Sequence, residues 1–148
     1  MMSNQDRVNA WNQAAGNYVG DAPLEANAGD VSPIGLRRSL LEEEFEETDF
    51  ALRDLEDYAA YEDETSYRQA MIEVADGLAD LLYVAYGIAG YLGFDLDEVF
   101  AEVARSNDSK IDWSTGRAWA YRDDGKITKD DHYEAPRIEE IIYGSSSR

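Results

Sequence analysis

Residues 71–92 read MIEVADGLADLLYVAYGIAGYL, and this stretch decides the fold. Apolar residues cover almost the whole circumference of a helix drawn through it, which predicts a buried helix. Glu73, Asp76 and Asp80 interrupt the apolar pattern at positions i, i+3 and i+7, so they share one face. Structural salt bridges are one explanation, but the nearest cation in sequence is Arg68. Because carboxylates rarely enter so apolar a helix unpaired, this face is a candidate site.

A second acidic feature precedes this helix. Residues 42–47 read EEEFEE, and on a helix both Glu43 and Glu44 are neighbours of Glu47. Two carboxylates roughly 4 Å apart repel by about 4 kcal/mol at an effective dielectric constant of about 20, and the run contains no Lys or Arg to offset this. The run alone fits a solvated acidic surface equally well. Two facing acidic helices, however, form an oxygen cage suited to hard divalent cations, in outline a binuclear site for Mg²⁺ with Mn²⁺ as a substitute.

The rest of the chain predicts further helices and few strands. Gly, Pro, Asn and Asp gather in a connecting loop over residues 20–33, and Asp124-Gly125 is a hairpin dipeptide. Apolar spacing predicts helices over 4–18, over 33–61 with a break near Thr48 left open, from Thr65 or Ser66 to 92, and over 96–106. Expected caps and stops are Ser32 with Pro33, Gly93, and Asp95. The fold class is therefore an all-α bundle of four to five helices, followed by a mostly irregular tail with a late turn at 136–143.

Composition restricts the classes of function. The 148 residues include 32 acidic and 13 basic side chains, for a net charge of −19, which argues against a nucleic-acid partner. The absence of cysteine and the single His132 exclude disulfides, thiolate zinc sites and histidine clusters, so oxygen must hold any metal. No apolar run approaches the roughly 20 residues of a membrane span, and the N-terminus lacks signal-peptide features. We expect a soluble, cytoplasmic, single-domain protein over 1–148, with a core at about 8–110 and a tail at 111–148.

Positive charge is scarce and lies in a few places. Residues 105–110 read RSNDSK at the end of the fourth helix, where a cation and an amide can meet phosphate oxygens. Lys126 and Lys129 follow in the tail, and Arg37 and Arg38 precede the glutamate run. For any one of these residues taken alone, ordinary surface charge is the stronger interpretation.

Together these features resemble the all-α nucleoside triphosphate pyrophosphohydrolases, the MazG-like and phosphoribosyl-ATP pyrophosphohydrolase-like group. The resemblance is carried by LLEEEFEE at 40–47, DGLADLLYV at 76–84 with Tyr86-Gly87 after it, and SNDSK at 106–110. Weaker similarities lie at 11–16, Arg37, 124–126 and Pro136, so that the resemblance covers about residues 8–142. The ordered combination is far more specific than any single acidic motif.

The resemblance identifies two metal-binding motifs. Glu43, Glu44 and Glu47 satisfy the first, EExxE. In the second, ExxD, Asp80 matches the aspartate but Gly77 stands where the glutamate belongs. The neighbouring Asp76, and less closely Glu73, keep carboxylates on that face. This departure is similar to a phage-type and dUTPase-like branch of the group, in which case the cytoplasm is that of a host cell.

The resemblance implies hydrolysis of a nucleoside triphosphate to the monophosphate and pyrophosphate, in a dimer or a dimer of dimers. Glu44 or Glu47 would be the general base, Asn107 and Lys110 would hold phosphates, and Arg37, Lys126 and Lys129 are possible helpers. Trp11 and Tyr83 either wall a base pocket or pack in the core. Two alternatives stay open: a pyrophosphohydrolase acting on another diphosphate such as phosphoribosyl-ATP, and a non-enzymatic acidic helical interaction protein.

Overall fold

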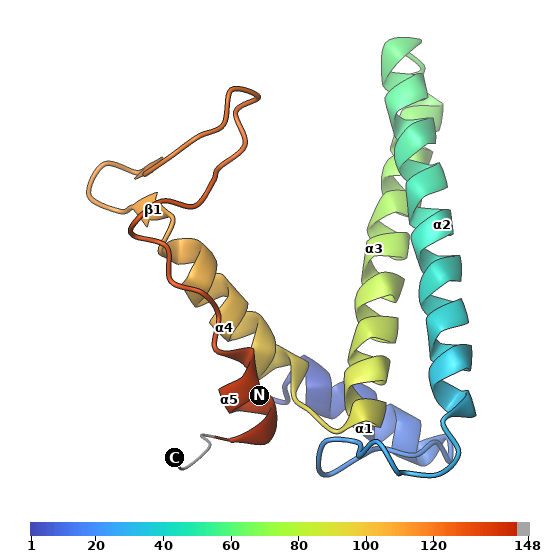
Figure 1. Cartoon of the computed structure of the whole chain (residues 1–148). Helices are drawn as coiled ribbons and strands as arrows, with labels where there is room; N and C mark the ends of the chain where they lie inside the picture. Colours follow the sequence, from blue (N-terminus) through green and yellow to red (C-terminus); the bar gives the residue numbers. More distant parts are fainter. Residues whose placement is uncertain (145–148) are drawn as a thin grey trace. The chain divides into compact units, whose positions relative to one another are not determined.

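The chain forms two compact units in the computed structural model, which describes residues 1–144 (Figure 1). The first unit, Met1–Gly93, contains α1 (Asn4–Ala14), α2 (Ser32–Ala60) and α3 (Glu64–Leu92). The second begins at Phe94 and contains α4 (Leu96–Asp108), β1 (Ile111–Asp112), β2 (Arg117–Ala118) and α5 (Ile138–Tyr143). The predicted all-α class is confirmed. Among the described residues, no single helix has both the length and the apolar character needed to cross a membrane.

Helices α2 and α3 lie side by side and antiparallel over most of their length (Figure 1). They approach each other closely at Gly77, where an added Cβ would lie 2.6 Å from the Thr48 hydroxyl oxygen. Thr48 is buried, and its hydroxyl donates a 2.7 Å hydrogen bond to the Glu44 carbonyl one turn earlier. That bond keeps the hydroxyl satisfied within the helix, and α2 runs through Thr48 without the break that the sequence left open.

Polar contacts hold α1 and the following loop against α3. The Gln5 side chain is buried and donates a 3.1 Å hydrogen bond to the Tyr86 carbonyl. The Gly20 and Leu24 amides donate to carbonyls in the last turn of α3, those of Gly90 and Leu92, at 2.8 and 2.9 Å. The end of α3 is thereby fixed to the N-terminal segment of the chain.

The helix boundaries differ from the sequence prediction at three positions. Ser32 is the first residue of α2 rather than its N-cap, which is Val31 without a side-chain hydrogen bond, and the Asp30 carboxylate accepts the Ser32 amide at 2.8 Å. At the start of α3, Asp63 is the cap and accepts the Ser66 amide at 3.1 Å, so neither Thr65 nor Ser66 caps this helix. The helix expected over 4–18 ends at Ala14. The expected stop at Gly93, with φ of +81°, and the Asp95 cap are confirmed.

The expected burial of α3 is wrong for a single chain. Its buried residues are mostly small and lie on the sides facing α1 and α2, whereas Ile72 is 63% exposed and Leu82 is 59% exposed. Two neighbouring helices cover only part of a helix that is apolar nearly all round. A large apolar surface of the first unit therefore faces outward.

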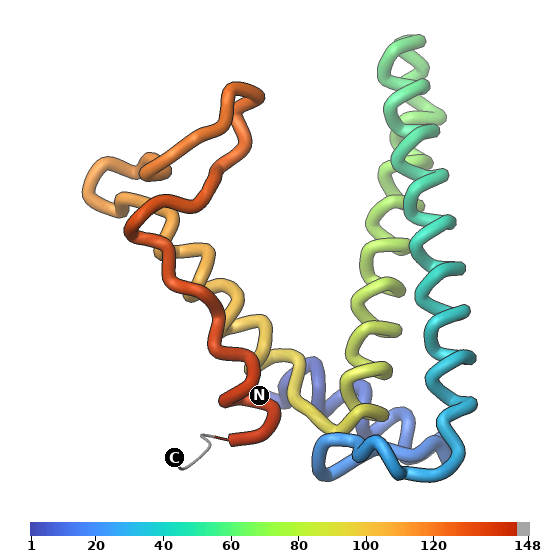
Figure 2. The backbone as a smooth tube through the Cα atoms, viewed as in Figure 1, coloured from blue at the N-terminus to red at the C-terminus, as the bar shows by residue number. Residues whose placement is uncertain are grey.

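In the second unit, the chain beyond the strands turns back and runs along α4 (Figure 2). Glu102 on α4 holds this returning segment against the helix. Its carboxylate binds the Arg105 guanidinium at 2.7 Å and accepts a 2.8 Å hydrogen bond from the Arg137 backbone amide. Arg105 also pairs with Glu134 at 2.6 Å. The strands β1 and β2 are antiparallel, and a separate bridge between Tyr121 and Ile127 encloses the predicted Asp124-Gly125 turn.

We expect Glu102→Gln to weaken the attachment of the segment at Arg137 to α4. Hydrogen bonds from Arg105, then from the Arg137 amide, lower the pKa of Glu102 to about 2 from the usual 4.5. The stabilisation is therefore complete above pH 4.5 and is lost as the pH falls through about 2. At neutral pH the variant should exchange the Arg137 amide hydrogen several times faster than the wild type, as read by mass spectrometry. Glu98→Gln, at an exposed position on the same helix, is the control. Equal exchange in all three proteins would contradict the assignment.

Candidate functional site

Carboxylates from two helices line one cavity of about 340 Å³ in the first unit. Glu47 and Asp54 come from α2, and Glu73, Asp76 and Asp80 come from α3. The predicted meeting of the two acidic helices is thus observed. Asp54 was missed by the sequence analysis, although it follows Glu47 by seven residues and so lies on the same face of α2.

The contact between Thr48 and Gly77 determines where the carboxylates of α2 and α3 lie. Glu44 and Glu47 lie within one turn of Thr48, and Asp76 and Asp80 lie within one turn of Gly77. A side chain at position 77 would run into the backbone and hydroxyl of Thr48, with a Cβ only 3.3 Å from the Thr48 Cα. The glutamate of an ExxD motif therefore has no space at position 77, and the carboxylates flanking it line the cavity instead.

Glu44 lies at the centre of a field of like charges. Partial burial raises its pKa first, and the charges of Asp80, Glu47, Glu43 and Asp76 raise it further. The ion pairs of α2, Arg38 with Glu42 at 3.6 Å and Arg53 with Asp49 at 2.7 Å, involve other residues. Within residues 1–144 no cation pairs with Glu43, Glu44, Glu47, Asp76 or Asp80. Without a bound cation, the carboxylates of this cluster therefore repel one another.

The donor chemistry of the cluster fits a hard divalent cation, because every donor is a carboxylate oxygen and none is neutralised. The side chains are nevertheless spread apart: in the described chain no three Asp, Glu or His residues already surround a point where a metal ion would sit. Glu73 accepts a 3.0 Å hydrogen bond from Gln69. Glu43 is exposed and does not line the cavity, but its charge contributes to the raised pKa of Glu44.

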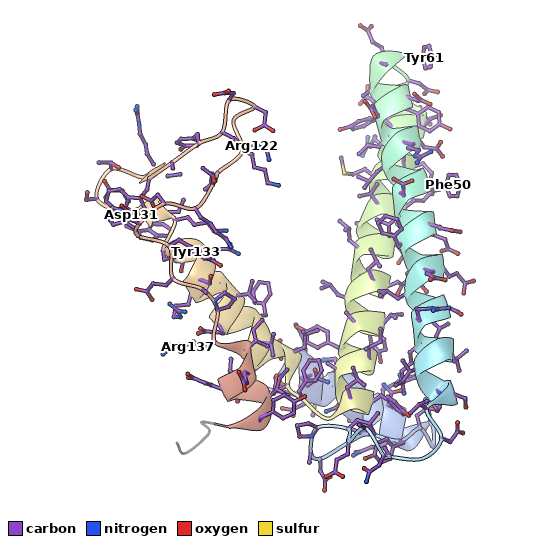
Figure 3. All side chains as sticks on the ribbon, viewed as in Figure 1. Phe50, Tyr61, Arg122, Asp131, Tyr133 and Arg137 are labelled. Carbon is purple, nitrogen blue, oxygen red and sulfur yellow. The ribbon has the colours of Figure 1, made fainter. Side chains whose placement is uncertain are left out.

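The predicted phosphate-binding residues belong to the second unit, and only some of them meet. The Lys110 ammonium binds the Asn107 amide oxygen at 2.7 Å, and the ammonium groups of Lys110 and Lys129 lie 5.6 and 4.3 Å from the centre of the Tyr133 ring (Figure 3). A hydrogen bond with Ser106, then Lys129, lowers the pKa of Tyr133. Lys126 lies instead at the Asp124-Gly125 turn, where its amide binds Asp124. Tyr133 was not predicted from the sequence.

Arg37 lies elsewhere in the first unit, seven residues before Glu44 on α2. Its guanidinium stands 4.8 Å over the Tyr91 ring, and burial lowers its pKa. Trp11 meets Tyr83 edge to face at 6.0 Å, but the Trp11 side chain is 57% exposed. Core packing within the chain therefore does not account for Trp11.

A family model described as phosphoribosyl-ATP pyrophosphohydrolase matches residues 25–107. This segment is more than half of the chain and includes all of α2 and α3 with nearly all of α4. The chain belongs to this family. Since the family is part of the MazG-like all-α superfamily, the resemblance drawn from the acidic motifs is confirmed, and the protein is a pyrophosphohydrolase. The match contains every carboxylate of the cavity. A search of curated proteins found no match.

We expect Glu44→Gln to stabilise the metal-free protein at pH 7. A raised pKa means that the folded state binds the Glu44 proton more readily than the unfolded state, so the charged form costs stability above that pKa. The variant should melt at a higher temperature at pH 7, and its advantage should shrink as the pH falls toward the ordinary glutamate value of 4.5. Thermal unfolding with a chelator present measures this difference.

The matched control is Glu46→Gln. Glu46 is exposed in the same run, and it is not among the charges that raise the pKa of Glu44. It should leave the melting temperature nearly unchanged. An equal gain from both substitutions would indicate a general effect of net charge rather than a local cluster.

Proposed function

We propose that this pyrophosphohydrolase converts nucleoside triphosphates to the monophosphate and pyrophosphate with Mg²⁺, or Mn²⁺ in its place. The observation that carries the proposal is the cavity lined by carboxylates of α2 and α3, which form no ion pair with a cation among residues 1–144. Phosphoribosyl-ATP, whose name the family carries, is the alternative substrate and would use the same carboxylates.

Glu47, Asp76 and Asp80 are the cavity residues that would hold the metal, with Asp54 and Glu73 lining the same cavity and Glu43 as a further ligand from beside it. When bound, Mg²⁺ neutralises phosphate oxygens and lowers the pKa of water. We assign the general base to Glu44, because its raised pKa makes it a better proton acceptor than an ordinary glutamate. Glu44 takes the proton of the attacking water, and the Thr48 hydroxyl on the Glu44 carbonyl fixes the helix turn that carries it.

We assign phosphate binding to Asn107, Lys110 and Lys129, with Lys126 as a weaker helper. All three lysines of the chain lie within residues 110–129, and two of them meet at Tyr133. A triphosphate brings about four negative charges toward a protein of net charge −19, so its approach is unfavourable without such cations.

Pyrophosphate release tests the assignment of the carboxylates. Glu47→Gln and Asp80→Asn should each reduce metal-dependent turnover by on the order of a hundredfold or more, because each removes a charged donor from the cavity. Helical circular dichroism should remain unchanged, and Glu46→Gln should keep wild-type turnover. A panel of the common ribo- and deoxyribonucleoside triphosphates, with phosphoribosyl-ATP beside them, identifies the substrate. Near-wild-type turnover by either cavity variant would overturn the metal assignment.

We also propose that the protein assembles as a dimer or a dimer of dimers. The support is the outward apolar surface of α2 and α3, where Phe45 is 62% exposed and Ile72 and Leu82 are exposed as well. Phe50, 63% exposed, belongs to the same set and points away from the helix pair (Figure 3). Apolar surface on this scale is characteristic of an interface between chains.

Light scattering at micromolar concentration should therefore give two or four times the chain mass of 16.6 kDa. Leu82→Glu should lower that mass, because it places a charge on the apolar face, whereas Glu56→Gln on the acidic side of α2 should not. A wild-type mass equal to one chain would refute the assembly.

A further inference from the structure

A second and larger cavity, of about 520 Å³, lies in the first unit at the start of α2 and the end of α3. Three aromatic side chains, those of Trp11, Tyr18 and Tyr91, form much of its wall. Tyr18 and Tyr91 meet edge to face at 5.8 Å, and Tyr18 is 57% exposed. Trp11 and Tyr18, each 57% exposed, keep surface for stacking against a planar heterocycle, whereas Tyr91 is buried and the Arg37 guanidinium lies over its ring.

The charge in this cavity is positive. Among the described residues that line it, Arg37 is the only charged one, and no Asp or Glu lines the cavity although the chain carries 32 of them. The Arg37 Nε is buried and has no hydrogen-bond partner within the described residues. A buried donor without an acceptor is costly, and the guanidinium that carries it lines the cavity, so the site favours a ligand with acceptor atoms for this group.

Asn12 adds a second donor whose orientation is fixed. Its amide oxygen accepts a 3.1 Å hydrogen bond from Asn17, and its amide nitrogen donates to the Val8 carbonyl at 3.0 Å. At Gly87 on α3, an added Cβ would lie 3.5 Å from Arg37 Nη1 and 3.8 Å from Asn12 Nδ2. The guanidinium and the amide therefore border the same point of α3, in an adjoining cavity of about 190 Å³ that Trp11, Asn12, Arg37 and Leu40 also line.

We infer that this cavity binds the base of the nucleotide. It prefers uracil, thymine and guanine, which carry a keto oxygen at pyrimidine position 4 or purine position 6, over cytosine and adenine, which carry an amino group at that position. The inference rests on the proposed function. A guanidinium donates and never accepts, so it pairs with the O4 of uracil or thymine or with the O6 and N7 of guanine, and it leaves an amino group at the same position unpaired. Arg37 and Glu44 stand two helical turns apart on α2, roughly 10 Å, a separation that a nucleotide bridges between base and phosphates.

Titration calorimetry of the full chain, without metal, tests this preference apart from hydrolysis. The probes are the 5′-monophosphates of uridine, guanosine, cytidine and adenosine, with inorganic pyrophosphate as a further arm. The uridine and guanosine nucleotides should bind about tenfold more tightly than the other two. Arg37→Gln and Arg37→Lys should both remove that difference, since lysine keeps the charge but loses the planar pair of donors.

Arg38→Gln is the matched control, because Arg38 is the next residue, pairs with Glu42 and does not line this cavity. It should keep the base preference. Equal affinity for all four monophosphates, or a preference that survives in Arg37→Lys, would overturn the inference. Binding of pyrophosphate that Arg37→Gln abolishes would also overturn it, because the cavity would then be an anion site. If triphosphates were not hydrolysed while the base preference held, the proposed function alone would fail.

Discussion

The close approach of α2 and α3 at Thr48 and Gly77 is the constraint on which the first unit depends. It requires a residue without a side chain at 77 and a small, internally satisfied one at 48. Once the helices meet there, Glu44 and Glu47 on one side and Asp76 and Asp80 on the other are brought to the same level of the pair. The feature that departs from the family's acidic motif is thus the feature that brings the remaining carboxylates together.

This arrangement leaves two kinds of side chain in the first unit in unfavourable surroundings. Its carboxylates repel one another without a cation, which raises the pKa of Glu44, and its helices expose apolar side chains on the faces that α1 does not cover. The repulsion between carboxylates and the exposure of apolar side chains both lower the stability of the folded chain. Each feature therefore indicates a binding partner that would relieve it. Divalent cations match the carboxylates, and another apolar helical surface matches the outward faces.

The sequence predicted the features that depend on short spacings along one helix. The helix class, the αL stop at Gly93, the Asp95 cap and the shared face of Asp76 and Asp80 all follow from local chemistry. Features that depend on contacts between segments were missed. Val31 and Asp63 occupy the N-cap positions expected for other residues, Asp54 lines the cavity, and Lys129 rather than Lys126 lies with Lys110 at Tyr133. The burial of α3 was overestimated because periodicity indicates which faces are apolar and not what covers them.

The distribution of charge along α2 favours one orientation of the proposed nucleotide substrate. Arg37 stands at its beginning and the glutamates two turns later, so the helix changes from an unpaired donor to a repulsive set of acceptors over a short distance. A metal-free phosphate chain is repelled by the second group, whereas an uncharged base is not repelled by either. With a metal ion at the carboxylates, a nucleotide gains most when its base lies at Arg37 and its phosphates lie at the metal, because the reverse orientation would leave the metal ion without phosphate oxygens. The order of these groups along one helix therefore favours one orientation of the nucleotide.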